Sequence, residues 1–211
     1  MKNQKISNNV IRRLPRYIRH LDILADAGVI RISSSELGDQ MNLTASQIRQ
    51  DFNCFGGFGQ QGYGYNVEEL RGQLASILGM SESRTAIIIG AGNLGRAIIK
   101  HFKFGACGVT LKAAFDIDNE RSISGPPFLP VYDMGELETY LEENETDIAV
   151  LTLPSNTANE IAVRLVKAGI KGIWNFTNVE LRNIPKDIVV ENVHFSDSLL
   201  TLNYYLSQKE K

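Results

Sequence analysis

The sequence predicts an α/β protein in which a small helical domain precedes a doubly wound parallel sheet. Two observations support this fold class. Three helical patterns follow one another closely in the first 55 residues, and from residue 85 onward apolar strand patterns alternate with helical ones. The predicted division is a first domain at 1–80, a second at 81–195 and a terminal helix at 196–211.

The composition is that of an ordinary globular protein, with 43% hydrophobic and 22% charged residues among 211. No apolar run reaches the ~20 residues that a membrane helix needs, and the first residues lead into no apolar signal core. The two cysteines, Cys54 and Cys107, lie far apart and belong to no Cys/His cluster. We therefore expect a cytoplasmic protein with no membrane segment and no metal site.

The net charge of −2 hides an asymmetry along the chain. Residues 1–80 hold nine Lys/Arg and seven Asp/Glu, a balance of +2, so the remainder carries −4. The first twenty residues contain six basic residues and no acidic one. A basic front end suggests a polyanionic partner, with an ordinary solvated helix face as the alternative.

The helical patterns of the first domain have the order of a helix-turn-helix. Apolar residues recur with helical spacing over 8–27, and Pro15 indicates that this helix begins near it, with the proline in the first turn. Ser33 to Ser35 open a second helix. Thr44 is expected to cap a third helix over 45–52, with Gln47 completing a capping box.

Five glycines alternate with aromatic residues over 55–65, directly after the third helix. This alternation predicts a β-hairpin, the wing of a winged helix-turn-helix domain, and a loop without regular structure is the alternative. A linking helix is expected over 67–78, and a domain boundary at 81–83.

The second half predicts strands at 85–90, 109–116, 148–153, 172–176 and 188–195, with helices at 93–103, 134–143 and 157–168. Strands that are apolar throughout belong to a parallel sheet covered on both faces, as in a Rossmann domain. The segment 197–208 predicts a short helix with a strongly apolar surface. A partner subunit is a good candidate to cover it, which indicates a homodimer.

A glycine-rich loop lies between the first of these strands and the following helix. Gly90, Gly92 and Gly95, with Ala91, Asn93 and Leu94 between them, have the spacing that lets a dinucleotide pyrophosphate approach a helix N-terminus. Asp116 ends the next strand 21 residues after Gly95, where a carboxylate accepts hydrogen bonds from an adenosine ribose. Its charge favours NAD over NADP. The alternative is that Asp116 is a turn residue.

The spacing of acid and base residues suggests binding of the nucleotide rather than its chemical conversion. The three histidines, His20, His101 and His194, form no recognisable catalytic constellation. Since 116 residues follow Gly95, there is no room for a separate substrate domain. We therefore expect no enzyme, with an NAD-dependent enzyme kept as the alternative.

Seven segments together carry a specific resemblance. They are 13–19 (Arg-Leu-Pro-Arg-Tyr-Ile-Arg), 47–52 (Gln-Ile-Arg-Gln-Asp-Phe), 62–67 (Gly-Tyr-Gly-Tyr-Asn-Val), 90–95, 115–116, 169–177 and 190–193. Over nearly its whole length the chain resembles the Rex family of bacterial redox-sensing transcriptional repressors. The resemblance implies a winged-helix domain, a Rossmann domain that binds NAD+ and NADH, and a homodimer whose C-terminal helices are exchanged. It also implies binding to double-stranded inverted-repeat operator DNA when NADH is scarce and release when NADH rises.

The resemblance also assigns residues to roles. The third helix would lie in the major groove, where arginine pairs with guanine and glutamine with adenine. The hairpin tip would enter the minor groove, and Thr152, Pro154, Thr177 and Phe195 would lie beside the cofactor. The DNA-binding residues implied are Arg12, Arg13, Arg16, Ser46, Gln47, Arg49, Gln50, Gln60, Gln61, Gly62 and Tyr63.

The chain departs from the family pattern at four positions. Gln50 and Gln61 stand where the family usually has basic residues, which suggests a weaker or altered operator specificity. His101 and His194 stand where it usually has tyrosine and aspartate, and there the aspartate exchanges partners between the counterpart of Arg19 and the tyrosine. A histidine at 194 cannot form that ion pair with Arg19. This predicts a blunted or pH-sensitive NADH response, and two histidines that simply pack together are the alternative.

Overall fold

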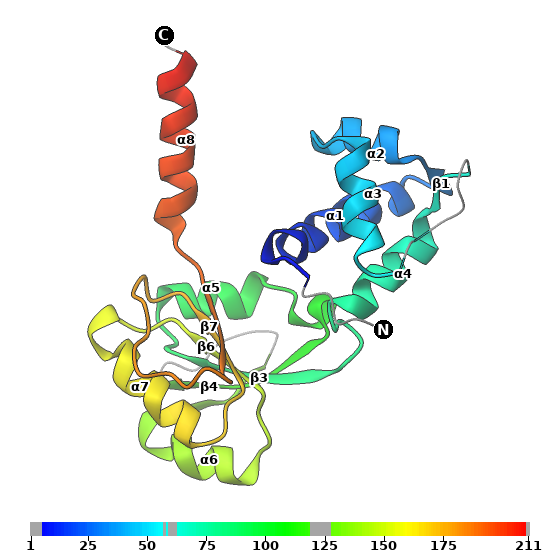
Figure 1. The fold of residues 1–211 in the computed structure, drawn as a ribbon. Coiled ribbons are helices and arrows are strands. Elements are labelled where there is room, and N and C mark those ends of the chain that lie inside the picture. Colours follow the sequence, from blue (N-terminus) through cyan, green and yellow to red (C-terminus); the bar gives the residue numbers. More distant parts are fainter. Residues whose placement is uncertain (1–5, 57, 59–62, 119–127, 210–211) are drawn as a thin grey trace. The chain divides into compact units, whose positions relative to one another are not determined.

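The computed structural model describes residues 6–56, 58, 63–118 and 128–209 (Figure 1). The chain divides into two compact units, Met1–Ser81 and Glu82–Lys211. The wing positions Gln60, Gln61 and Gly62 lie outside the described residues.

The described residues of the first unit form four helices and a two-stranded antiparallel sheet. Its elements are α1 (Asn8–Asp26), β1 (Arg31–Ile32), α2 (Ser34–Met41), α3 (Ala45–Asn53), β2 (Tyr65–Asn66) and α4 (Val67–Ile77). Helices α2 and α3 form the helix-turn-helix pair. Asn42, with a φ of 54°, supplies the left-handed residue that ends α2.

The prediction that the first helix begins near Pro15 is wrong. Helix α1 begins at Asn8, where the Ser7 side chain accepts a hydrogen bond from the Val10 amide, and it continues through Pro15. An interior proline costs about 3 kcal/mol. Here Leu14 and Tyr17 are buried on either side of it, and the burial of this apolar face offsets the lost hydrogen bond.

The caps of the two following helices differ from each other. In α2, Ser33 and Glu36 form a reciprocal capping box. In α3, the Thr44 side chain accepts the Gln47 amide as predicted, but the predicted capping box does not form. The Gln47 side chain donates to Asp51 instead.

The described part of the wing pairs with a strand that precedes the helix-turn-helix. Ile32 of β1 is opposite Tyr65 of β2, so a partner outside 55–65 supplies one side of the sheet. Gly64 has a φ of 68°, and a Cβ there would lie 2.7 Å from the Ile32 carbonyl oxygen. The aromatic ring of Phe58 packs edge-on against Phe52 at 5.6 Å, which joins this segment to the core.

A buried carboxylate joins α1 to α3. Asp51 is 1% exposed and accepts four hydrogen bonds. Arg13 donates two of them, from Nε at 2.6 Å and Nη2 at 2.7 Å. The Tyr17 hydroxyl donates at 2.7 Å and the Gln47 amide at 2.8 Å. A carboxylate accepts up to about four such bonds, so its burial is fully compensated.

The second unit is a six-stranded parallel sheet in the order β5-β4-β3-β6-β7-β8, which confirms the predicted Rossmann fold class. The strands are β3 (Arg84–Ile89), β4 (Val109–Asp116), β5 (Val131–Asp133), β6 (Ile148–Leu151), β7 (Gly172–Asn175) and β8 (Val189–Asn192). The helices are α5 (Asn93–His101), η1 (Phe104–Cys107), η2 (Met134–Glu136), α6 (Leu137–Glu143), α7 (Ser155–Lys167) and α8 (Phe195–Lys209).

Helices cover both faces of this sheet, as Figure 1 shows. Ile87 and Ile89 belong to the core cluster that includes residues of α6 and α7, whereas Ile88 packs with Ile99 of α5. Successive residues of a strand point to opposite faces. The unbroken apolar run of β3 therefore fills both cores.

One strand was missed, and several element boundaries differ from the predictions. Strand β5 was not expected, because three half-buried residues give no usable periodicity. The last strand ends at Asn192 rather than at 195, and α8 begins at Phe195. No helix among the described residues is long and apolar enough to cross a membrane.

The Asp51 cluster predicts an acid-sensitive contribution to stability. Burial alone would raise the pKa of Asp51, but hydrogen bonds from Arg13, Tyr17 and Gln47 outweigh it and lower this pKa. The stabilisation is therefore complete above the unfolded value of about 4 and is lost as pH falls through the lower folded value. Asp51→Asn should cost about 2–3 kcal/mol at neutral pH. It should also flatten the fall in unfolding free energy below about pH 4.

Denaturant melts of both proteins between pH 7 and 2 measure this difference. A parallel fall of the two curves below pH 4 would contradict the assignment.

Candidate functional site

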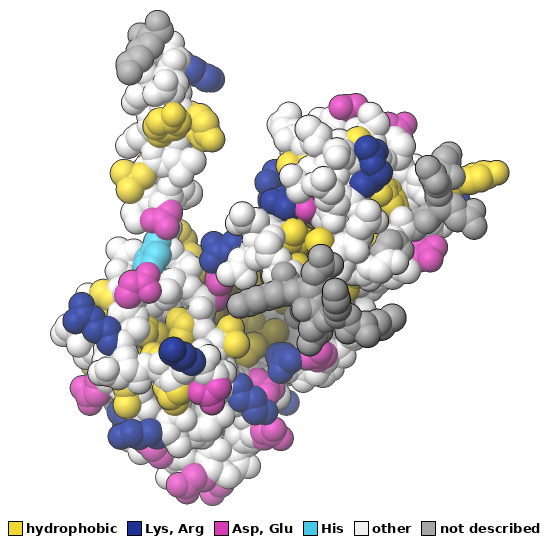
Figure 2. Space-filling view, in the orientation of Figure 1, with side chains coloured by type: hydrophobic (Ala, Val, Ile, Leu, Met, Phe, Trp, Pro, Cys, Tyr) yellow, Lys and Arg dark blue, Asp and Glu magenta, His cyan; other side chains and the backbone are white. Residues whose placement is uncertain are grey.

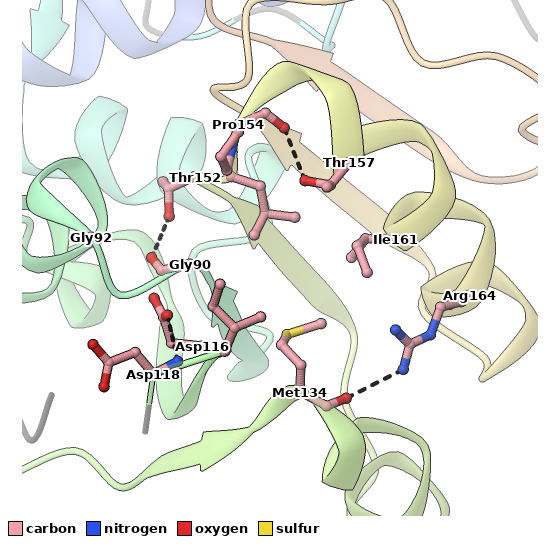
Figure 3. A pocket seen from close by; sticks show the side chains of 12 residues that line it. Gly90, Gly92, Asp116, Asp118, Met134, Thr152, Pro154, Thr157, Ile161 and Arg164 are labelled. Atoms are coloured by element: carbon pink, nitrogen blue, oxygen red, sulfur yellow. Dashed lines mark hydrogen bonds between the residues drawn. The ribbon is translucent and has the colours of Figure 1, made fainter. Parts of the chain in front are cut away.

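A cavity of about 720 Å³ opens at the carboxyl ends of the strands, where the sheet order reverses between β3 and β6 (Figure 3). In doubly wound sheets this reversal creates the crevice in which ligands bind. The cavity is lined by Gly90, Gly92, Asp116, Ile117, Asp118, Met134, Thr152, Leu153, Pro154, Thr157, Ile161 and Arg164.

Each of the three glycines in the loop is explained by a different geometric feature. Gly90 has a φ of 100°, and a Cβ there would lie 2.8 Å from the Thr152 carbonyl oxygen. A Cβ on Gly95 would lie 2.0 Å from the Gly90 carbonyl oxygen, so the helix packs directly on the loop. Gly92 has no heavy atom within 4 Å of its Cβ position. The absence of a side chain at Gly92 leaves open the space through which a ligand can approach the protein backbone.

The loop ends at the N-terminus of α5. No side chain caps this helix. The amides of Asn93, Leu94 and Gly95 occupy its first turn, where an α-helix offers them no internal acceptor. Arg96 Nε donates to the Ala91 carbonyl oxygen at 2.8 Å and holds the loop against the helix. The uncapped first turn is suited to an anionic group.

Asp116 connects the glycine loop to the end of β4. Its carboxylate accepts the Ala91 amide at 2.6 Å and the Asp118 amide at 3.0 Å, and the residue is 8% exposed. Part of its hydrogen-bonding capacity is therefore used within the chain. Each carboxylate oxygen has a second acceptor position, so a ribose contact stays a prediction.

The opposite wall comes from β6 and α7. The Thr152 hydroxyl donates to the Gly90 carbonyl at 2.7 Å and fixes the loop from this side. Arg164 is held by Glu138 at 2.7 and 2.9 Å and by the Met134 carbonyl at 3.2 Å. The hydrogen bond from Arg164 lowers the pKa of Glu138, so the pair stays ionised.

The sequence reasoning missed seven lining residues. In the sequence, Thr157, Ile161 and Arg164 belong to an ordinary helical pattern, and Met134 to the start of another. The helical spacing of Thr157, Ile161 and Arg164, which puts them on one face, was the available signal. The remaining three are Ile117 and Asp118, which directly follow a predicted strand, and Leu153, the last residue of another.

Six predicted cofactor residues do not line this cavity. Four of them, Ala91, Asn93, Leu94 and Gly95, belong to the glycine loop and the first turn of α5, whereas Thr177 and Phe195 lie elsewhere in the unit. Thr177 is buried, and its amide and hydroxyl both donate to Asn175 Oδ1. Phe195 is 60% exposed, and its ring centre lies 6.2 Å from that of Phe176. Their place beside a nicotinamide stays a prediction.

The two unusual histidines have different surroundings. His194 Nδ1 lies 3.3 Å from Asn178 Oδ1, and Nε2 lies 3.3 Å from Glu180 Oε1. Glu180 also accepts from Asn192, which accepts from Asn175. His101 is exposed at the end of α5. His194, between β8 and α8, therefore has its partners in the segment that joins β7 to β8.

Helix α3 presents a polar surface opposite its buried face. Ile48, Asp51 and Phe52 are buried, whereas Ser46, Arg49 and Gln50 are exposed. Arg49 Nη1 donates to the Ser34 hydroxyl at 2.9 Å. Gln47, expected to face DNA, is turned toward Asp51.

The basic residues of α1 also divide into two groups. Arg12, Arg16 and Arg19 are exposed, whereas Arg13 is engaged by Asp51. The sequence alone could not show this, because the two residues are 38 positions apart. At the wing, Tyr63 is 71% exposed, and its carbonyl accepts from Arg31 at 3.1 Å, a residue that the sequence analysis missed.

No group of three or more His, Cys, Asp or Glu among the described residues is arranged to hold a metal ion.

Two protein-family descriptions match the chain. "Putative DNA-binding protein N-terminus" covers residues 5–53, and "CoA binding domain" covers residues 81–179. Together they describe a DNA-binding domain followed by a nucleotide-binding domain.

Known proteins resemble the chain along its whole length. The redox-sensing transcriptional repressor Rex of Thermoanaerobacter pseudethanolicus is 50% identical over 99% of this chain and 93% of that protein. The Rex of Clostridium botulinum is 48% identical over 99% of both. A crystal structure of RSP with NAD+ and operator DNA matches with a TM-score of 0.90 at 50% identity, covering 99% of this chain and 95% of that one. A structure of RSP with NADH matches at 0.89 and 47%, covering 99% and 97%.

A helix-turn-helix unit joined to a dinucleotide-type crevice defines a nucleotide-responsive transcription regulator rather than an enzyme. The relatives bear this out, since they are named as transcriptional repressors. The chain belongs to the Rex family of redox-sensing transcriptional repressors.

The glycine geometry predicts opposite outcomes for two alanine substitutions. Gly95→Ala should destabilise the second unit by about 3 kcal/mol or more, because its Cβ would overlap the Gly90 carbonyl. Gly92→Ala should change stability by less than about 1 kcal/mol, since its φ of −70° suits alanine and the space is open.

Gly92→Ala should nevertheless weaken NADH binding about tenfold or more, a change of about 1.4 kcal/mol. Thermal melts and NADH fluorescence titrations measure both effects. Wild-type affinity in Gly92→Ala would show that no ligand approaches the loop there.

Proposed function

We propose that this chain represses transcription in response to the NADH/NAD+ ratio, binding an inverted-repeat operator when NADH is scarce and leaving it when NADH rises. The observation that carries the proposal is the glycine loop at the sheet reversal, in a chain that also presents a helix-turn-helix surface. The RSP structures, one with NAD+ and operator DNA and one with NADH, support the proposal that this chain binds DNA and both forms of the dinucleotide.

In this proposal the dinucleotide pyrophosphate lies over Gly92 and the first turn of α5. The adenosine ribose hydroxyls donate hydrogen bonds to the Asp116 carboxylate. A 2′-phosphate would meet the carboxylates of Asp116 and Asp118 at this end of the cavity, so NADH is preferred over NADPH. Thr177 and Phe195 lie toward the nicotinamide.

On the DNA side, α3 enters the major groove with Ser46, Arg49 and Gln50 on its exposed face. Tyr63 and the wing tip reach the minor groove, and the exposed arginines of α1 approach phosphates. Two half-sites of an inverted repeat require two copies of this domain.

The homodimer that this requires has a ready contact surface in α8. No residue of this helix is buried. Figure 2 shows hydrophobic side chains standing out along it, and the exposed ones are Leu199, Leu200, Leu202, Tyr204, Tyr205 and Leu206. An apolar surface of this kind is stabilised by a partner. We propose that the helices are exchanged between two copies of the chain in the cytoplasm.

A gel mobility-shift series tests the proposed function. A duplex with an inverted-repeat Rex operator should form one complex with two chains per duplex, stable with NAD+ and dissociated by NADH. The NADPH concentration that releases half of the operator should be at least about tenfold higher than that of NADH, a difference of about 1.4 kcal/mol. No shift with or without NAD+, or a complex that ignores NADH, would contradict the proposal.

A second version of this function has a damped NADH response. Its supporting observation is that His194 is held by Asn178 and Glu180 within its own domain. A neutral imidazole cannot form with an arginine the ion pair that a carboxylate forms. In this version the nucleotide binds, but its reduction is transmitted weakly to the DNA-binding domain.

Restoring the family residues tests this version. The double substitution His101→Tyr and His194→Asp should lower the NADH concentration that releases half of the operator, with NADH affinity changed less than about twofold, or 0.4 kcal/mol. The single His101→Tyr variant is the matched control. Complete release of the wild type by low-micromolar NADH at neutral pH would rule out a damped response.

A further inference from the structure

Two residues expected to touch DNA are instead committed to one buried carboxylate. Arg13 and Gln47 both donate to Asp51, at 2.6 to 2.8 Å. The Tyr17 hydroxyl, on a fully buried side chain, donates to the same carboxylate. If Arg13 or Gln47 turned away to reach DNA, the Asp51 carboxylate would lose a partner. Because Asp51 is only 1% exposed, an incompletely paired charge there would be costly.

The four side chains form a bridge between two helices. Arg13 and Tyr17 lie one turn apart on α1, and Gln47 and Asp51 lie one turn apart on α3. The ring of Tyr17 also packs edge-on against Phe52 at 5.0 Å. The bridge therefore contacts both the first and the last turn of α3, and so it resists rotation of the helix about its axis.

The charges within the bridge compensate each other. Hydrogen bonding to Asp51 raises the pKa of Arg13, and the same contacts lower that of Asp51, so both stay ionised. A guanidinium already paired with a carboxylate in fork geometry has little charge left for a phosphate. Arg13 would then release no counterion when DNA binds.

The fixed rotation of α3 determines which side chains point outward. At ~100° per residue, Ser46 and Gln50 lie about 160–200° from the buried Ile48. Asn53 continues this stripe three residues further and is also exposed. Arg49 lies at the flank, where it donates to Ser34 of α2.

We propose that Asp51, with Arg13, Tyr17 and Gln47, is a positioning cluster that fixes the rotation of α3 and leaves base reading to the stripe of Ser46, Gln50 and Asn53. This inference rests on the proposed function, since it concerns how the same helix recognises DNA. Asp51, Arg13, Tyr17 and Gln47 act through the helix and do not touch bases or phosphates.

Salt dependence separates a positioning residue from a phosphate contact. Each phosphate contact adds about 0.9 to the slope of log affinity against log salt concentration. Arg13→Lys should keep the wild-type slope and lose operator affinity about 5- to 50-fold, or 1–2.3 kcal/mol, because lysine cannot reproduce the two-bond fork. Affinity for an unrelated duplex should change by less than about twofold, or 0.4 kcal/mol. Arg16→Ala, an exposed arginine of the same helix, is the matched control.

Base preference separates the cluster from the reading stripe. Gln50→Ala or Asn53→Ala should relax the preference at a single base pair of the half-site by about 5- to 150-fold, the range of a 1–3 kcal/mol bidentate contact. Gln47→Ala should weaken operator binding while leaving the preferred sequence unchanged. Tyr17→Phe removes one hydrogen bond and keeps the ring, so it should behave like Gln47→Ala in a protein that still melts cooperatively.

Three results would overturn the inference. The first is operator binding by Arg13→Lys equal to that of the wild type, which a phosphate contact predicts. The second is a salt slope that is lower by about one unit in Arg13→Ala. The third is a relaxed preference at one base pair in Gln47→Ala. Failure of the wild type to bind the operator overturns the proposed function and this inference together. Normal wild-type binding with any of the three results overturns the inference alone.

Discussion

The close approach of three backbone segments at the carboxyl end of β3 is the constraint on which the nucleotide site depends. Gly95 packs on the Gly90 carbonyl, and the Thr152 hydroxyl donates to that same oxygen. Asp116 holds the Ala91 amide from the neighbouring strand. The loop is thus held by β4, β6 and α5 at once, and the cavity lies where these elements diverge. Without a side chain at Gly90 and Gly95, the loop fits this space without strain.

Each unit uses a buried aspartate to hold its binding element, and the two do so differently. Asp116 accepts backbone amides of neighbouring turns, so it fixes the loop through the chain itself. Asp51 accepts four side-chain bonds from two helices, so it fixes one helix against another. In both places the desolvation of a buried carboxylate is compensated because hydrogen bonds within the protein replace those of water. The exposed side chains of α3 and the open space at Gly92 lie beside these two carboxylates and stay accessible.

Local pattern and spacing made the fold and the nucleotide loop predictable from the sequence. Gly90 to Gly95 and Asp116 each directly follow a predicted strand, and the carboxyl ends of neighbouring parallel strands lie at one edge of the sheet. The partners of Asp51 could not be found in this way. Arg13 lies 38 residues away, and its position on α1 is equally compatible with a contact to DNA. Arg164 was missed for the same reason, since its partner Glu138 lies on another helix. Long-range side-chain pairing has no periodic signature.

The segment after β7 shows how one end of the sheet is connected to α8. Asn175 is fully buried; its Oδ1 accepts from Thr177 and its Nδ2 donates to Asn192. Asn192 donates to Glu180, which also meets His194, the residue directly before α8 begins at Phe195. Hydrogen bonds in such a chain depend on one another, since a shift of one donor changes the geometry offered to the next. The residue before α8 is therefore connected to buried Asn175 through half-buried Asn192 and exposed Glu180, while no residue of α8 itself is buried.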